Sequence, residues 1–285
     1  MSILVFSLLV ALGSFVAGTL GALTGLGGGV VIVPLLTVGF GVELHYAIGA
    51  SLVSVIATSS GAAAAYVRDG YTNVRIGMFL EMATTCGALL GGVLVALLPT
   101  HAVSIIFGVV LLFSAFFSTH RGDPAPFNPK PGDPQTFAQR IRMTGTLPTP
   151  GEGGGRVAYV ARRVPLGFVL MIVAGMLSSL LGIGSGAFKV LAMDNAMGLP
   201  FKVSTTTSNF MIGVTATTGV GAYLGHGYID PALAMPVMLG VLAGSLVGAK
   251  VLVRARSKYL RYAFMLVLLA LGVQMILTGA GIGHV

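Results

Sequence analysis

The chain alternates between long apolar stretches and short polar connections. Ten apolar segments can be read, five before residue 118 and five after residue 165. Eight of them approach or exceed the roughly twenty residues with which a helix crosses about 30 Å of hydrocarbon. The pattern predicts an all-α integral membrane protein with about eight full transmembrane helices, at residues 2–24, 46–67, 74–98, 100–117, 166–184, 203–224, 231–252 and 259–281.

The two remaining segments, 30–42 and 187–199, hold only about a dozen residues each. At about 1.5 Å per residue they are too short to span a bilayer alone. Each one directly follows a cluster of glycines. We therefore expect two broken or re-entrant helices, and the sequence leaves open whether the short segments cross or fold back.

The two glycine clusters belong to a repeat with a constant offset. Gly25-Leu26-Gly27-Gly28-Gly29 matches Gly182-Ile183-Gly184-Ser185-Gly186 at a shift of 157 residues. The same shift relates further pairs without a gap, which indicates duplication: Gly18/Gly175, Gly41/Gly198, Ser51/Ser208, Thr58/Thr215, Tyr66/Tyr223, Gly70/Gly227, Gly87/Gly244 and Gly91/Gly248. The predicted organisation is an N-terminal transmembrane repeat, a linker and a C-terminal transmembrane repeat, at residues 1–117, 118–165 and 166–285.

The linker is rich in proline and glycine, with basic residues among them. This composition is typical of a mobile tether, with one short basic helix near Phe137–Met143. A regulatory site in the linker is the alternative.

Basic residues distinguish the connections of the two halves. Equivalent loops have opposite basic content, and basic loops favour the cytoplasmic side. We therefore expect two inverted-topology repeats in a bacterial cytoplasmic (inner) membrane, with the linker cytoplasmic and both termini periplasmic. The third segment is followed by Arg68 and Arg75 in half one but by His226 and Asp230 in half two; the fourth is followed by His101 in half one but by Arg254, Arg256, Lys258 and Arg261 in half two.

Composition supports the membrane assignment. Hydrophobic residues make up 55% of the chain and charged residues only 8%, against about 25% charged in soluble domains. The formal net charge of +8 lies mainly in hydrophilic connections, which suits anionic lipid better than nucleic acid. Cys86 is the single cysteine, so an intrachain disulfide and a cysteine metal cluster are excluded. No cofactor, metal site or catalytic residue is expected.

The glycine clusters are the first candidate binding site. A helix that restarts inside the membrane presents free N–H groups and a partial positive charge, and glycine lets a ligand approach the backbone. Two such ends related by inversion would form a nest for an anion. The alternative is that these glycines only permit a bend or tight packing. The candidate residues are Gly25, Gly27, Gly28, Gly29, Gly182, Gly184, Ser185 and Gly186.

Polar side chains in the third segment of each half could complete this site. Ser51 and Thr58 share one helix face and recur as Ser208 and Thr215. Asn209 follows a run of hydroxyl residues, Ser204 to Ser208. Such groups bind an oxyanion through hydrogen bonds and carry no full charge themselves. The alternative is that they form hydrogen bonds between helices or with carbonyls of their own helix.

Two charged residues fall inside predicted segments, where charges are expensive and often functional. Lys189 could neutralise an anion, snorkel to the surface or pair with Asp194. Glu81 is the candidate carboxylate for proton coupling, and an interfacial position is the alternative.

Small residues form faces on the fourth segments, with Gly87 and Gly91 in half one and Gly240, Gly244 and Gly248 in half two. Such faces allow close helix packing, either within the monomer or across a homodimer.

Motifs of the first half resemble those of the TauE/SafE sulfite exporter family. The resemblance rests on Gly18-x-x-Gly21-x-x-Thr24-Gly25-x-Gly27-Gly28-Gly29 with the apolar run to Pro34, on Ala47-x-Gly49-x-Ser51-Leu52, and on the second glycine cluster. It implies a secondary transporter for small sulfur-containing anions such as sulfite, thiosulfate or organosulfonates. Ser185 and Leu191 replace the glycine and proline of half one, so the two half-sites differ.

The resulting hypothesis is an exporter that works by alternating access and binds its anion between the two broken helices. A passive anion channel and a non-transporting membrane scaffold are the alternatives. An enzyme is disfavoured because the sequence holds no His-Glu-x-x-His, no Gly-x-Ser-x-Gly and no acid pair within spans.

Overall fold

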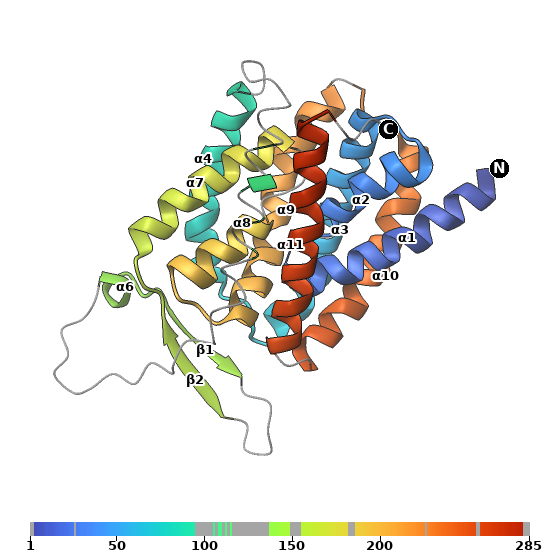
Figure 1. Cartoon of the computed structure of the whole chain (residues 1–285). Helices are drawn as coiled ribbons and strands as arrows, with labels where there is room; N and C mark the ends of the chain where they lie inside the picture. Colours follow the sequence, from blue (N-terminus) through green and yellow to red (C-terminus); the bar gives the residue numbers. More distant parts are fainter. Residues whose placement is uncertain are drawn as a thin grey trace.

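The computed structural model describes residues 3–25, 27–94, 105, 108, 109, 112, 115, 137–148, 155–181, 186–225, 227–254 and 257–281. It is mostly helical (Figure 1). The fifth predicted segment, 100–117, lies largely outside the described residues. The elements in chain order are α1 (Ile3–Thr24), α2 (Gly29–Pro34), η1 (Leu35–Gly39), α3 (Leu44–Arg68), α4 (Val74–Leu94), α6 (Phe137–Arg140), β1 (Thr144–Pro148), β2 (Arg156–Val160), α7 (Val164–Leu181), α8 (Gly186–Leu191), η2 (Ala192–Ala196), α9 (Phe201–Gly225), α10 (Pro231–Arg254) and α11 (Ser257–Gly279).

Four of the described helices, α1, α3, α4 and α10, are long and apolar enough to cross a membrane. On α1 the large exposed side chains recur every fourth residue, with Leu8 and Leu12 each 58% exposed. A helix that presents such a face needs a hydrocarbon solvent. The chain is therefore a multi-pass, predominantly helical membrane protein.

The short helix α2 folds back along α1. A Cβ atom at Gly21 would lie 2.1 Å from the Gly28 amide nitrogen, and one at Gly13 would lie 2.7 Å from Leu35. Further along, the rings of Phe6 and Phe40 meet edge to face at 5.4 Å. Because residues later in this segment contact residues earlier in α1, the segment α2–η1 runs antiparallel to α1.

The segment α8–η2 returns along α7 in the same way. A Cβ atom at Gly167, in the first turn of α7, would lie 2.5 Å from the sulfur of Met197. Both short segments consist of six α-helical and five π-helical residues, and their bounds differ by 157 residues. Each spans too few residues to cross a bilayer. The prediction of two short helices is confirmed, and the structure adds their direction.

Glycines bring the first helix of each half against the fourth helix of the other half. A Cβ atom at Gly244 of α10 would lie 2.0 Å from the Phe15 carbonyl oxygen of α1, and one at Gly87 of α4 would lie 2.0 Å from that of Ile172 on α7. Gly244 follows Gly87 by 157 residues, and Ile172 follows Phe15 by the same number, so the two contacts are equivalent in the repeat. Backbones this close require glycine. The predicted small-residue faces thus pack within one chain.

The two central helices, α3 and α9, run antiparallel. Ser59 of α3 donates to the Asn209 carbonyl of α9, whereas Leu52, two turns earlier, lies against Gly219, further along α9. Most of α3 is buried, and so is the first half of α9. This pair forms the centre against which both re-entrant helices pack.

The linker contains a β-hairpin that the sequence analysis did not predict. Strands β1 and β2 pair antiparallel, with Thr144 opposite Val160. Asn73 fastens the hairpin to the bundle because its amide nitrogen donates to the Thr144 carbonyl (3.1 Å) and to the Tyr159 hydroxyl (3.0 Å). This part of the linker is therefore docked structure rather than a tether. The short helix expected near Phe137–Met143 is present as α6 (Phe137–Arg140).

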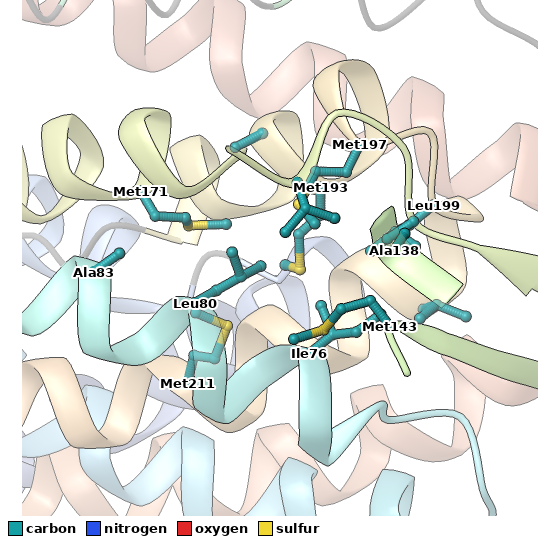
Figure 2. Packing of buried hydrophobic residues seen from close by; sticks show 14 of the residues in the cluster. Ile76, Leu80, Ala83, Ala138, Met143, Met171, Met193, Met197, Leu199 and Met211 are labelled. Carbon is teal, nitrogen blue, oxygen red and sulfur yellow. The ribbon is translucent and has the colours of Figure 1, made fainter. Parts of the chain in front are cut away.

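Apolar side chains complete the docking of the linker. Figure 2 shows Ala138 and Met143 of the linker in one buried cluster with Ile76 of α4 and Met193 and Met197 of the second re-entrant segment. Unbranched methionine side chains fill irregular gaps and adapt to changes in packing. The hairpin thus contacts the same cluster that supports the second short helix.

The two ends of the bundle differ in chemistry. At the hairpin end, Lys202 donates to the Val253 carbonyl and lies 5.9 Å from the centre of the Tyr71 ring. At the opposite end, His45 stacks on Tyr228 with ring centres 4.8 Å apart. Helix α3 ends at Arg68 and helix α10 ends at Arg254, both at the hairpin end. The loops that follow these two residues were predicted to lie on the same side of the membrane.

Candidate functional site

The break between α1 and α2 lies inside the protein. Gly25, Gly27 and Gly28 adopt positive φ angles of 79°, 79° and 75°, which side chains with a Cβ rarely adopt. All three are buried. A Cβ atom at Gly27 would lie 3.1 Å from Ile212 of α9 and 3.3 Å from Val55 of α3. Irregular backbone at membrane depth is thus enclosed by the two central helices, as the lipid environment demands.

The candidate residues Gly182, Gly184 and Ser185 of the second glycine cluster lie outside the described part of the chain. Gly186, where α8 begins, is described and buried. The candidate Gly29 holds the corresponding first position of α2.

The predicted serine pair anchors both short helices. Ser51 Oγ donates to the Gly29 carbonyl at 3.1 Å, and Ser208 Oγ donates to the Gly186 carbonyl at 3.2 Å. Ser208 Oγ also lies 2.9 Å from the Gly25 carbonyl oxygen, so this hydroxyl touches the first break as well. Thr58 instead bonds the Ser54 carbonyl of its own helix. In this structure these hydroxyl protons therefore point to protein carbonyls.

Lys189 of α8 forms a buried ion pair with Glu81 of α4. The Lys189 Nζ lies 2.9 Å from Glu81 Oε2, and the two side chains are 0% and 6% exposed. Thr215 of α9 accepts from Lys189 and donates to the other carboxylate oxygen, each at 2.5 Å. Thr84 donates to Glu81 Oε2 at 3.1 Å. Three helices thus contribute to one closed polar cluster, which we call the ion-pair cluster: Glu81, Thr84, Lys189 and Thr215.

This arrangement bears on the alternatives for Lys189. Its side chain does not snorkel to the surface but pairs with Glu81, which is itself buried in the protein. Their pairing could not be predicted because 108 residues separate them. A buried charge costs several kcal/mol unless it is paired and hydrogen-bonded, and here both conditions are met.

A second polar group lies beside the first break. Asn209 Nδ2 donates to the Ala22 carbonyl at 2.9 Å, close to the end of α1. The Asn209 Oδ1, Thr205 Oγ1 and Ser204 Oγ atoms are buried and have no hydrogen-bond partner among the described residues. Buried polar atoms are almost always paired in proteins, so these three acceptors call for an explanation.

The polar groups are distributed unevenly over the two halves. A shift of 157 residues places Ile32 at the position of Lys189 and Met238 at that of Glu81. It likewise places Leu52 at the position of Asn209. None of the three residues has a polar counterpart in the other half, so the two half-sites differ, as the sequence suggested.

Comparison with known proteins identifies the family. A sequence profile described as "Sulfite exporter TauE/SafE" matches residues 10–275, nearly the whole chain. The chain belongs to the sulfite exporter TauE/SafE family. It is accordingly a membrane transporter of the TauE/SafE type, and the membership is consistent with the absence of enzyme motifs noted in the sequence.

Curated relatives of this TauE/SafE protein extend over its full length. It is 27% identical to the probable membrane transporter protein YunE of Bacillus subtilis over 281 residues, covering 96% of this chain and 98% of that protein. It is 26% identical to YdhB of the same organism, covering 85% and 89%. A probable membrane transporter of Methanocaldococcus jannaschii is 24% identical, covering 96% and 97%. No solved structure matches the chain.

Proposed function

We propose that this protein is a secondary transporter, acting as an exporter, of small sulfur-containing anions such as sulfite, thiosulfate or organosulfonates. The observation that carries the proposal is Lys189, a fully buried cation on a re-entrant helix beside a glycine break. A buried ammonium inside a transporter is a natural counter-charge for an anionic solute. The family description, which names a sulfite exporter, supports the chemical class.

We infer two inverted repeats and an anion site between them. The antiparallel course of α3 and α9, and the helix contacts that recur at a shift of 157 residues, support this architecture. Discontinuous helices at the interface of inverted repeats are where such transporters bind their substrates. The proposed ligands are Gly25, Gly27, Gly28, Gly29, Ser51, Thr58, Gly182, Gly184, Ser185, Gly186, Lys189, Ser208, Asn209 and Thr215.

The orientation in the membrane is part of the proposal. The hairpin end carries Arg68, Lys202 and Arg254, and we place it in the cytoplasm on the positive-inside rule. The N-terminal end of α1 then faces the periplasm, together with Tyr46 and Tyr228. Aromatic side chains such as these are enriched at membrane interfaces.

A cleft at this opposite end offers a route for the solute. Its volume is about 660 Å³, and it is lined by Phe6, Ser7, Val42, Tyr46, Gly227, Asp230, Ala232 and Leu233. The residues come from α1, from the loop after η1, from the first turn of α3, and from the loop before α10 and the first turn of α10. We propose that this cleft is the periplasmic mouth, closed from Lys189 in the present conformation. Alternating access would connect this cleft with Lys189.

Flux into proteoliposomes tests the proposal. Purified protein is expected to carry radiolabelled thiosulfate and a small alkylsulfonate with saturable kinetics. Lys189→Met is expected to abolish saturable flux, whereas the matched control Lys250→Met, on an exposed position of α10, leaves it unchanged. No saturable flux of any sulfur oxyanion by the wild-type protein would refute the function, and full flux by Lys189→Met would refute the site.

A further inference from the structure

The ion-pair cluster places a protein carboxylate where a transported anion would bind. Glu81 receives hydrogen bonds from Lys189, Thr84 and Thr215, so an ammonium and two hydroxyls converge on one carboxylate. This is a binding site for a small oxyanion, and Glu81 is the oxyanion that it holds in this structure. A sulfonate or thiosulfate needs the same hydrogen-bond donors from the protein as a carboxylate, because each presents several oxygens that accept hydrogen bonds.

We propose that Glu81 and the substrate anion compete for Lys189, so that each anion bound at Lys189 is accompanied by one proton on Glu81. This inference rests on the proposed function and adds its coupling ion. When the anion takes the ammonium, Glu81 loses its only cation in the cluster. A buried carboxylate without a cation is strongly destabilised. Taking up a proton from water removes that charge, and the neutral acid can still share hydrogen bonds with Thr84 and Thr215.

We assign the proton to Glu81 because the other charged residues on α4 and on the elements that pack against it are exposed or have interactions of their own. Helix α7, which packs along α4, carries no titratable residue between Val164 and Leu181. On α9 the only charged residue is Lys202, which bonds the Val253 carbonyl at the hairpin end. On the segment α8–η2 the other charged residue is Asp194, which is buried and has an interaction of its own. On α4 itself Arg75 and Cys86 are exposed, six residues before Glu81 and five residues after it.

The charge count gives the sign of the coupling. Before binding, the cluster holds one ammonium and one carboxylate; after binding, it holds the ammonium, a monovalent anion and a neutral acid. Binding therefore consumes one proton, and linkage requires that acid strengthens binding. Where binding takes up one full proton, the affinity for the anion is expected to rise about tenfold for each unit by which pH falls. Anion and proton would cross in the same direction, so export would be driven by the outward gradient of the anion itself.

The test uses an alkylsulfonate, because its own charge stays constant over the physiological pH range. Binding to the detergent-solubilised protein is measured by isothermal titration calorimetry at several pH values and in buffers of different ionisation enthalpy, which counts the protons exchanged. The expected result is proton uptake that approaches one proton per anion. Release of a proton, or no exchange at any pH, overturns the proposal.

Variants assign the proton to its residue. Infrared difference spectroscopy of sulfonate binding is expected to show the carbonyl band of a newly protonated carboxylic acid in the wild-type protein and to lack that band in Glu81→Gln. The control Glu43→Gln, which removes an exposed carboxylate at the opposite end, is expected to retain the band. The same band in a folded Glu81→Gln protein overturns the assignment.

The outcomes separate this inference from the proposed function. If the wild-type protein neither binds nor carries any sulfur oxyanion, the proposed function fails. If it carries the sulfonate but an imposed pH gradient changes neither the rate nor the accumulation in proteoliposomes, only the proton coupling fails. Should Glu81→Gln not fold, the wild-type calorimetry and the gradient experiment still decide the question.

Discussion

Removing the ammonium of Lys189 is expected to destabilise the protein strongly, and removing Glu81 as well is expected to restore most of the loss. Lys189→Met leaves the Glu81 carboxylate buried without a cation. Breaking a buried ion pair from one side costs about 3–5 kcal/mol. Because Thr84 and Thr215 still bond the carboxylate, we expect the lower part of that range, about 3 kcal/mol.

The double variant Lys189→Met/Glu81→Gln removes both charges and keeps similar volumes. Replacement of a buried pair by neutral groups is often close to neutral in stability. The double variant is thus expected to be more stable than Lys189→Met alone, with a coupling energy of about 2–3 kcal/mol in the double-mutant cycle.

Equilibrium unfolding in mixed detergent micelles, followed by circular dichroism, measures the four proteins. The exposed neighbours Arg68 and Asp69 give a matched cycle, because their side chains are 80% and 35% exposed and such pairs contribute below about 1 kcal/mol. Additive losses for Lys189→Met and Glu81→Gln would refute the reasoning, since they would mean that the two charges do not depend on each other.

Two further regions give predictions. Gly27→Ala places a side chain at a φ of 79° and is expected to cost about 1–3 kcal/mol of stability, whereas Gly221→Ala on α9, where nothing lies within 4 Å, is expected to be harmless; thermal unfolding distinguishes them. Asn73→Ala removes both hydrogen bonds to the hairpin and is expected to speed its cleavage in limited proteolysis, while the neighbouring Thr72→Val, which removes a buried hydroxyl without a partner among the described residues, is not. Burial raises the pKa of Tyr159, and its hydrogen bond with Asn73 opposes part of that rise. Because the phenol holds its proton more tightly in the folded protein, hairpin docking is expected to be constant at neutral pH and to weaken only as pH passes about 10, the ordinary tyrosine value. Cleavage that already increases at neutral pH would contradict this.

The sequence was sufficient for the features that rest on local pattern. Segment length predicted the two short helices, and glycine spacing predicted the close helix faces, because both follow from helix geometry and bilayer thickness. The symmetric serines were found through the repeat, although their hydroxyls bond carbonyls of the short helices instead of lying free.

The features that the sequence did not predict depend on contacts between distant segments. Glu81 and Lys189 were each singled out, but nothing local indicates that α4 and α8 meet. The hairpin was not predicted because its strands have only five residues each. Since β1 ends at Pro148 and Gly155 precedes β2, the segment has the composition of a loop. Its stability comes from the bundle, through Asn73 and the methionine cluster.

The glycine contacts between halves have a consequence for biosynthesis. Helix α1 is synthesised before α10 but has its backbone partner there, where Gly18 meets Val241, 241 − 18 = 223 residues later. At about 5–20 residues per second, this partner emerges roughly 10–45 s after α1. During that time the face of α1 that holds Gly18 lacks its partner helix. The packing of this face is completed only when α10 has been made, and a chain truncated before residue 231 would lack the helix that covers it.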